Sequence, residues 1–131
     1  MNTARVVRIL SLLSLASGVA AIIQPQVCAD FVGLAFEAGN PSGYGEVGAL
    51  YGGNFVALGL IGLYAARASV AAGPALLAAI GVVWLGIGGG RLLTILFTSP
   101  EPPGVMGWGF LAMELILGAT FIICRRPGAD S

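Results

Sequence analysis

The stretch ALLAAIGVVWLGIGGGRLLTILF, residues 75–97, decides the fold class of this chain. It is almost entirely apolar, and it reaches the roughly 20 residues that a helix needs to cross the hydrocarbon core of a membrane. Its one charged residue is Arg91. Because a charge within a transmembrane helix costs about 2.5–3.5 kcal/mol on insertion scales, we expect Arg91 to face the protein interior and to pair with an acid. Glu46 and Glu114 are the candidate partners.

Three further apolar runs, at residues 6–23, 47–66 and 105–124, approach the same length. Transmembrane β-strands would be about half as long and would alternate in polarity. Prolines lie between the runs, and Pro74 precedes the third run, where proline is tolerated as a first helical residue. The sequence therefore predicts an all-α, polytopic membrane protein, a four-transmembrane-helix bundle that forms a single domain over residues 1–131.

The composition agrees with lipid as the main solvent. Of the 131 residues, 57% are hydrophobic and 9% are charged, whereas a soluble domain has about 25% charged residues. The chain contains no histidine, which removes the commonest metal ligand and the easiest general base. We therefore expect no metal and no cofactor. The formal net charge is zero, so there is no basic surface for nucleic acid.

The arginines outside the apolar runs predict the orientation in the membrane. If both termini are cytoplasmic, the external segments, 24–45 and 98–104, contain no arginine, in agreement with the preference of positive charge for the cytoplasmic side. Cys28 and Cys124 then lie on opposite membrane faces, too far apart for a disulfide. The arginines that lie inside are Arg5, Arg8, Arg67, Arg125 and Arg126.

An alternative interpretation of the N-terminal segment is a cleaved signal peptide. It rests on the basic start, the apolar stretch and the small residues around 16–21. We favour a retained helix, because Ile22 and Ile23 extend the apolar run past any such cleavage site to a full span.

The first external segment, 24–45, is not uniformly polar. Val27, Phe31 and Leu34 recur in it at helical spacing. This pattern predicts a short amphipathic helix on the outer membrane surface, with its apolar side toward the lipid. Two roles are open for this helix: a cover over the end of the bundle, or a gate above a ligand cavity.

Polar residues of three helices are expected at similar depths. With a rise of 1.5 Å per residue, Asn54, Arg91 and Glu114 lie about 10–13 Å below the outer ends of their helices. Glu46 begins the second helix, where Tyr51 and Asn54 share a face. One interpretation of this cluster is a structural ion pair that fixes helix packing. The other is a polar pocket that opens outward and serves a ligand or a proton relay.

Small residues recur along one face of several helices. Because lipid gives helices no hydrophobic reason to associate, close packing of small residues must hold them together. The stripes predict a tight bundle or, alternatively, a glycine-rich face that meets a membrane protein partner or a second copy of the chain. They comprise Ser11, Ser14, Gly18 and Ala21; Gly48, Gly52, Gly59 and Gly62; and Ala78, Gly81, Gly88 and Gly89.

Part of this pattern resembles a known family. An acid, Glu46, stands at the mouth of the second helix, and the residues within the helices are Tyr51-Gly52-Gly53, Gly90-Arg91 and Glu114. With them the chain is similar to an uncharacterised family of small bacterial four-helix membrane proteins, domain of unknown function 4345, which is allied to the DoxX-like group. The resemblance implies a bacterial inner (plasma) membrane location and a functional set of Glu46, Tyr51, Arg91 and Glu114. It implies no reaction.

Three classes of function are compatible with these features. The first, which we favour, is a non-catalytic accessory or scaffold subunit that binds lipid and a membrane protein partner. The second is a binder or carrier of a small lipophilic molecule, such as a quinone or isoprenoid, whose polar head contacts Arg91 in an outward-facing pocket. The third is a lipid-modifying enzyme with Glu46 or Glu114 as acid or base, against which the lack of a nucleophile–base pair argues.

Overall fold

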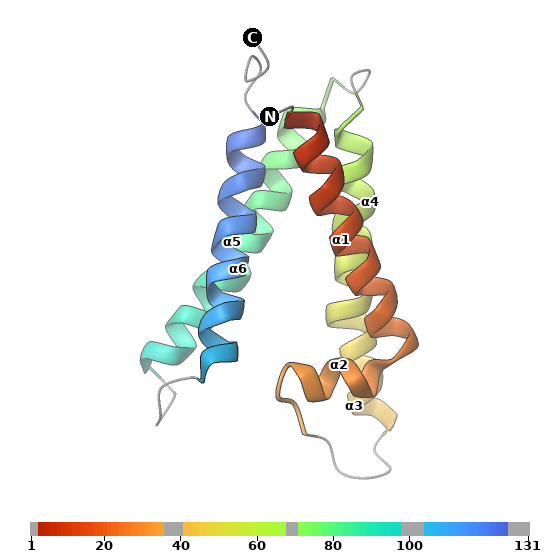
Figure 1. Cartoon of the computed structure of the whole chain (residues 1–131), viewed down its shortest axis with the longest axis vertical. Coiled ribbons are helices and arrows are strands. Elements are labelled where there is room, and N and C mark those ends of the chain that lie inside the picture. Colours follow the sequence, from red (N-terminus) through yellow and green to blue (C-terminus); the bar gives the residue numbers. More distant parts are fainter. Residues whose placement is uncertain (1–2, 36–40, 68–70, 98–103, 126–131) are drawn as a thin grey trace. The chain divides into compact units, whose positions relative to one another are not determined.

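In a computed structural model, residues 3–35, 41–67, 71–97 and 104–125 are described, and every regular element among them is helical (Figure 1). The all-helical fold class predicted from the apolar runs is confirmed. The elements are α1 (Thr3–Ile23), α2 (Pro25–Phe31), α3 (Pro41–Val47), η1 (Gly48–Gly53), α4 (Asn54–Ala65), α5 (Gly73–Phe97) and α6 (Val105–Cys124).

Four helical segments of the described chain are long and apolar enough to cross a membrane. They are Thr3–Ile23, Ser42–Ala65, Gly73–Phe97 and Val105–Cys124. The second segment joins α3, η1 and α4 into one helix. The chain is therefore a multi-pass membrane protein. The orientation of its termini stays a prediction.

The chain divides into two compact units. One unit, Arg8–Tyr64, holds most of α1 together with α2, α3, η1 and nearly all of α4. The other consists of Met1–Val7 and Ala65–Ser131 and holds α5 and α6. Each unit contains its own closely packed helix pair. The single four-helix domain stays a prediction.

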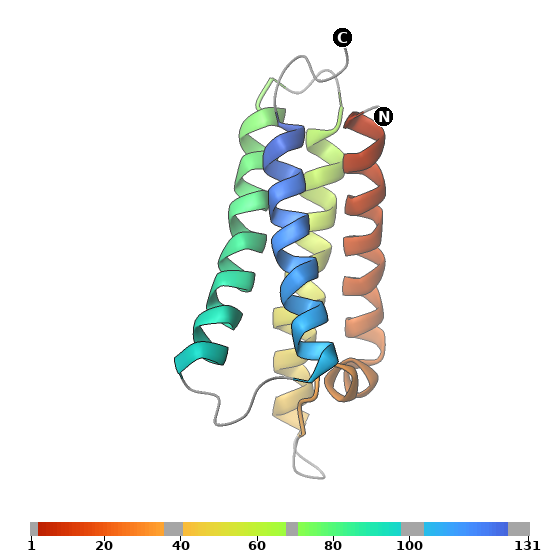
Figure 2. The ribbon, with the colours of Figure 1, turned by 60° about the vertical axis from the view of Figure 1, so that its left-hand side comes forward.

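In the unit Arg8–Tyr64, α1 runs antiparallel to the helix formed by η1 and α4 (Figures 1 and 2). The two backbones approach closely at two levels. A Cβ atom added to Gly18 would lie 2.7 Å from the carbonyl oxygen of Gly52, and one added to Gly59 would lie 2.7 Å from that of Ser11. The levels are seven residues apart on both helices (11 to 18 and 52 to 59), which is the repeat of a left-handed helix pair.

A side-chain hydrogen bond lies between these two levels. The hydroxyl group of Ser14 donates to the backbone oxygen of Phe55 at 3.0 Å. Interhelical hydrogen bonds from such groups contribute about 0.6–2 kcal/mol in lipid. The predicted small-residue stripe of the first helix therefore holds α1 against α4.

The start and the end of α2 each have a clear local cause. Residues that precede proline disfavour the helical conformation, and Gln24, before Pro25, has φ −130° and ψ 64°, so α1 ends there. At the other end Gly33 has φ 77°. Its N–H bonds to the oxygen of Asp30 at 3.2 Å, and the N–H of Leu34 bonds to that of Ala29 at 2.8 Å. This is a Schellman motif, which needs a residue that tolerates positive φ.

The second membrane-length helix contains a π-helical turn, η1 (Gly48–Gly53). At its end the backbone N–H of Asn54 bonds to the oxygen of Ala49, five residues earlier, and to that of Tyr51. Such turns are rare and occur often at functional sites. No sequence pattern predicted this turn. Tyr51 lies within it, and Asn54 follows it directly.

The other unit is built on α5 and α6, which run antiparallel and side by side (Figures 1 and 2). Gly81 and Gly118 face each other where the helices meet. A Cβ atom on Gly81 would lie 2.8 Å from the oxygen of Gly118, and one on Gly118 would lie 2.9 Å from the oxygen of Gly81. Backbone oxygens cannot move aside as a flexible side chain can, so both positions require glycine.

Candidate polar site within the spans

The glycine run before Arg91 sets the distance between α5 and α6 at the level of the candidate site. Gly88 is the residue of this run that faces α6. A Cβ atom added there would lie 3.3 Å from the Cβ of Glu114 and 3.0 Å from the Cδ2 of Leu115. At Gly89 and Gly90 an added Cβ would meet no atom within 4 Å among the described residues. Gly88 therefore allows α6 to approach α5 closely. The side chain of Arg91 extends from α5 to Glu114 on α6.

Arg91 and Glu114 form a two-point ion pair. The Nε of Arg91 donates to Oε2 of Glu114 at 2.9 Å, and Nη2 donates to Oε1 at 2.6 Å. The planar guanidinium group matches the carboxylate in this geometry, and such paired, charge-assisted hydrogen bonds are stronger than neutral ones. The pair therefore fixes the rotation and depth of α5 relative to α6.

The two partners differ in exposure. The side chain of Glu114 is 5% exposed, whereas that of Arg91 is 31% exposed. The carboxylate is thus enclosed and depends on Arg91 for compensation of its charge, because an uncompensated buried charge is strongly destabilising. Part of the Arg91 side chain stays accessible, whereas the carboxylate of Glu114 is enclosed.

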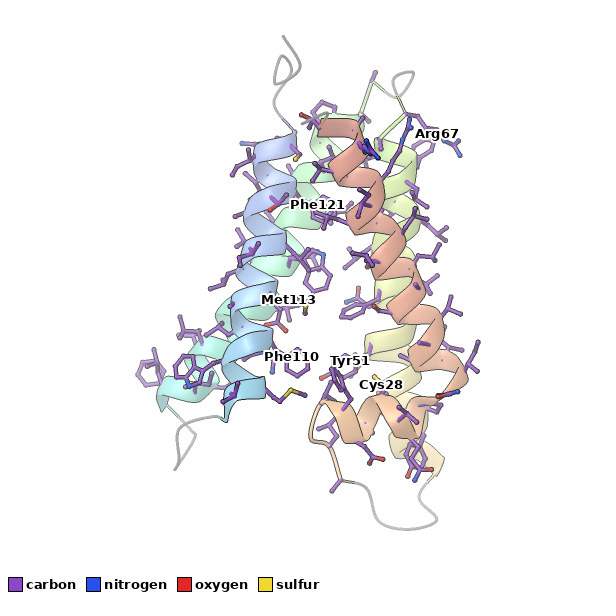
Figure 3. All side chains as sticks on the ribbon, in the orientation of Figure 1. Cys28, Tyr51, Arg67, Phe110, Met113 and Phe121 are labelled. Carbon is purple, nitrogen blue, oxygen red and sulfur yellow. The ribbon has the colours of Figure 1, made fainter. Side chains whose placement is uncertain are left out.

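An aromatic ring completes the site. The Cζ atom of Arg91 lies 5.5 Å from the centre of the ring of Phe110, whose side chain is labelled in Figure 3. Phe110 and Glu114 are four residues apart on α6, so they share a helix face. Cation–π attraction contributes about 0.5–2 kcal/mol, more when the cation is desolvated. Phe110 therefore holds the guanidinium group from a second direction.

The remaining residues of the predicted cluster belong to the unit Arg8–Tyr64. Glu46 is exposed in α3, and Asn54 is exposed at the start of α4. Tyr51 is half-buried in η1, where its ring meets that of Phe55 edge to face at 6.2 Å between centres and 79° between planes. The structure thus brings together Arg91 and Glu114. A contact of either with Glu46, Tyr51 or Asn54 stays a prediction.

Phe110 is the functional candidate that the sequence reasoning missed. The signal was present as the four-residue spacing between Phe110 and Glu114 on a predicted helix. Phenylalanine is common in apolar spans, so its presence there does not by itself indicate a functional role. Within the described parts of the chain, no group of three or more histidine, cysteine, aspartate or glutamate residues could hold a metal ion.

Cys28 is a titratable group outside the membrane-length segments, in α2 (Figure 3). It is half-buried. Burial disfavours the charged thiolate and raises the pKa of the Cys28 thiol above its ordinary value. Since the thiolate is the reactive form, we expect Cys28 to react with a thiol reagent more slowly than a fully solvated cysteine.

The fold and this site define a class: a small, multi-pass helical membrane protein whose spans carry an arginine–glutamate ion pair beside an aromatic ring. The chain belongs to the family described as a domain of unknown function, DUF4345, whose model matches residues 4–124. No curated protein and no solved structure matches it.

Proposed function

We propose that this chain is a non-catalytic accessory or scaffold subunit of the bacterial inner membrane that binds another membrane protein within the bilayer. Its termini are cytoplasmic, because every arginine other than Arg91 then lies in a cytoplasmic segment or near the cytoplasmic end of a membrane-length helix. The proposal includes the relation to the DoxX-like group that the sequence resemblance implies. One observation about α5 carries the partner-binding role.

The observation is an open glycine face on α5. Gly86 and Gly90 are exposed, and a Cβ atom added to either would meet no atom within 4 Å among the described residues. Each lies two residues from Gly88, which faces α6. Since two residues turn a helix by about 200°, Gly86 and Gly90 lie on the side of α5 away from α6. Two small residues four positions apart are the spacing that lets another helix approach closely in lipid.

The ion pair supports this role through rigidity. Arg91 follows Gly90 directly, and its two hydrogen bonds to Glu114 hold α5 at a fixed rotation. A partner helix therefore meets a preorganised glycine face, which lowers the entropic cost of binding. In this interpretation the charged residues are structural and the glycines make the contact.

The exposed apolar side of α2 supports a place for it in the outer membrane interface. Val27 is 60% and Phe31 is 59% exposed, four residues apart on the helix. Ala29, between them, is buried, and Asp30 is exposed. Apolar side chains of this kind bind the boundary between lipid headgroups and acyl chains. We propose that α2 covers the outer end of its own helix pair from that position.

Affinity purification from native membranes tests the partner-binding role. A tagged wild-type chain is expected to bring down one other membrane protein in stoichiometric amount. Gly86→Leu and Gly90→Leu are expected to lose that protein, because leucine prevents the close approach. Gly109→Leu is the matched control, since Gly109 on α6 is also exposed and open. Purification of the wild type alone, or equal loss in the control, would reject the role.

A second candidate function is the binding of a small lipophilic molecule with a polar head. The observation that favours it is the 31% exposure of the Arg91 side chain, because a partly accessible arginine in a span attracts carbonyl or phosphate oxygens. Native mass spectrometry of the protein in lipid nanodiscs tests it. A quinone- or isoprenoid-sized adduct should be present on the wild type and absent from the double variant Arg91→Gln, Glu114→Gln. An unchanged adduct pattern would reject this candidate.

A further inference from the structure

The π-helical turn η1 joins two parts of the second membrane-length helix that have different contacts. On one side of the turn, α4 is fixed to α1, because Ser14 bonds to the backbone oxygen of Phe55 at 3.0 Å. A Cβ atom added to Gly52, inside the turn, would lie 3.3 Å from the oxygen of Gly18 on α1. On the other side of the turn, α3 contacts α2, and Val47, its last residue, is buried. The turn therefore connects a helix anchored to α1 with a short helix that packs on α2.

The hydrogen bonds at the end of η1 omit the partner that an α-helix would use. In an α-helix the N–H of Asn54 would bond to the oxygen of Leu50, four residues earlier. It bonds instead to Ala49, five residues earlier, and to Tyr51, three residues earlier. A change of this one donor from Ala49 to Leu50 would turn a π-helical bond into an α-helical one. That single exchange would move the π-helical turn by one residue toward α3.

The packing of η1 does not explain two of its glycines. A Cβ atom added to Gly48 would meet no atom within 4 Å among the described residues. One added to Gly53 would lie at an ordinary 3.8 Å from the oxygen of Gly48. Glycine is the poorest helix former after proline, because it loses the most backbone freedom in a helix. Gly48 and Gly53 therefore weaken a regular α-helix at this point and ease the exchange of its hydrogen bonds.

We propose that η1 is a two-state switch that rotates α3 relative to α4. The first state is the structure described above, in which the π-helical turn holds one extra residue. In the second state the turn is α-helical. Each residue of an α-helix turns by about 100° and rises by about 1.5 Å, so the loss of the π-helical turn rotates α3 by about 100° and displaces it by about 1.5 Å. Helix α4 keeps its place on α1.

The rotation of α3 is transmitted to α2. Val47 is 2% exposed in the first state, and it would leave its buried position unless α2 moves with α3. Glu46, which is exposed on α3, would change direction in the same step. Any molecule that binds α2 or α3 in one orientation only would shift the equilibrium by its difference in affinity for the two states. The switch uses neither the glycine face of α5 nor the ion pair, so it goes beyond the proposed partner binding.

Backbone relaxation dispersion, measured by nuclear magnetic resonance on the full-length chain in lipid nanodiscs, tests the switch. The method detects exchange on the microsecond-to-millisecond timescale of helix register shifts. The amides of α3 and η1 are expected to exchange, and those of α4 from Val56 onward are not. A chain without Leu50 lacks the extra residue, so its helix is continuous and should show no exchange. Leu50→Ala is the matched control, because it keeps the number of residues and should keep the exchange.

Spin-label distances test the direction of the motion. Labels are placed on Val19→Cys in α1 and Gly45→Cys in α3, both at exposed positions, in a chain whose native cysteines are replaced by serine. Gly48→Ala with Gly53→Ala should favour the second state, because alanine is the best helix former. A new distance is expected there, shifted by up to about 8 Å for a 100° rotation at a helix radius of about 5–6 Å. The chain without Leu50 should retain the original distance alone.

Three results would overturn the switch. They are flat dispersion profiles in α3 and η1 of the wild type, exchange that persists without Leu50, and a double alanine variant with the distances of the wild type. The first measurement needs no variant, so it stands even if the shortened chain fails to fold. Loss of a partner protein in Gly86→Leu does not involve η1. Failure of the switch and failure of the partner-binding role are therefore distinguishable.

Discussion

At the scale of single residues, the arrangement of Arg91 and Glu114 makes each depend on the other. Glu114 is enclosed, and both oxygens of its carboxylate accept hydrogen bonds from Arg91. Removing one partner leaves an uncompensated charge in a medium of low dielectric constant. Removing both leaves an apolar contact that lipid and protein tolerate. The pair is therefore expected to act as one thermodynamic unit.

A double-mutant cycle measures this dependence. Arg91→Leu and Glu114→Leu are each expected to lower the free energy of unfolding by about 3–5 kcal/mol. The double variant should lose clearly less than the sum of the two, because it leaves neither charge without its partner. Unfolding of the four proteins in detergent gives these values. Strict additivity would show that the two residues contribute independently.

Arg91→Lys separates geometry from charge in the same assay. Lysine keeps the positive charge but replaces the planar two-point contact by a point charge. The cation–π contact with Phe110 also changes with the shape of the cation. We expect a smaller loss of stability than for Arg91→Leu, yet a measurable one. Full retention of stability would mean that charge alone is required.

At the scale of helices, Gly81 and Gly118 determine how closely α5 and α6 pack. Gly118→Ala is expected to lower the free energy of unfolding by about 1–3 kcal/mol, because the new methyl group would lie 2.9 Å from a backbone oxygen. Gly89→Ala is the control, since its methyl group meets no described atom within 4 Å. Chemical unfolding in detergent compares the two. Equal effects would show that loss of backbone freedom, rather than the clash, decides the outcome.

The four membrane-length helices could be predicted because the thickness of the bilayer fixes their length and composition. The start of the second helix was harder to predict from the sequence. The structure begins α3 at Pro41, whereas the apolar run begins at residue 47. The intervening segment contains Tyr44 and Glu46, so hydropathy excluded it, although helix formation depends on backbone hydrogen bonds and continues through polar residues.

Two local features could not be predicted from the sequence, for physical reasons. The π-helical turn η1 differs from an α-helix by one extra residue, and a single turn is too short to change a periodic pattern. The pairing of Arg91 with Glu114 depended on helix packing, because depth alone made both Glu46 and Glu114 reachable from Arg91. The packing is set by Gly88, whose contacts with α6 bring Glu114 within reach.

At the scale of the whole molecule, the orientation in the membrane is open to a direct test. A membrane-impermeant maleimide applied to intact cells is expected to modify Cys28 and to spare Cys124, because the arginine distribution puts α2 outside. Labelling after solubilisation in sodium dodecyl sulfate controls for the reactivity of both thiols. Modification of Cys124 without Cys28 would reverse the orientation.

The same label gives a pH dependence. Because burial raises the pKa of the Cys28 thiol, labelling of the folded protein should rise with pH at higher values than labelling of the unfolded chain. Burial favours the protonated thiol in the folded state. The stability that this protonated thiol contributes is therefore present at low pH and is lost as pH rises. Rates measured across a pH series in both states provide the comparison. Coincident curves would show a fully solvated thiol.

The ion pair also has a consequence for how the chain is made. Arg91 and Glu114 are 23 residues apart in sequence, and a ribosome adds about 5–20 residues per second. Arg91 has therefore been synthesised for about 1–5 seconds before its counter-charge is made. During that interval α5 is costly to release into the bilayer alone. The two helices are thus best delivered to the lipid together, as a hairpin already closed by its own salt bridge.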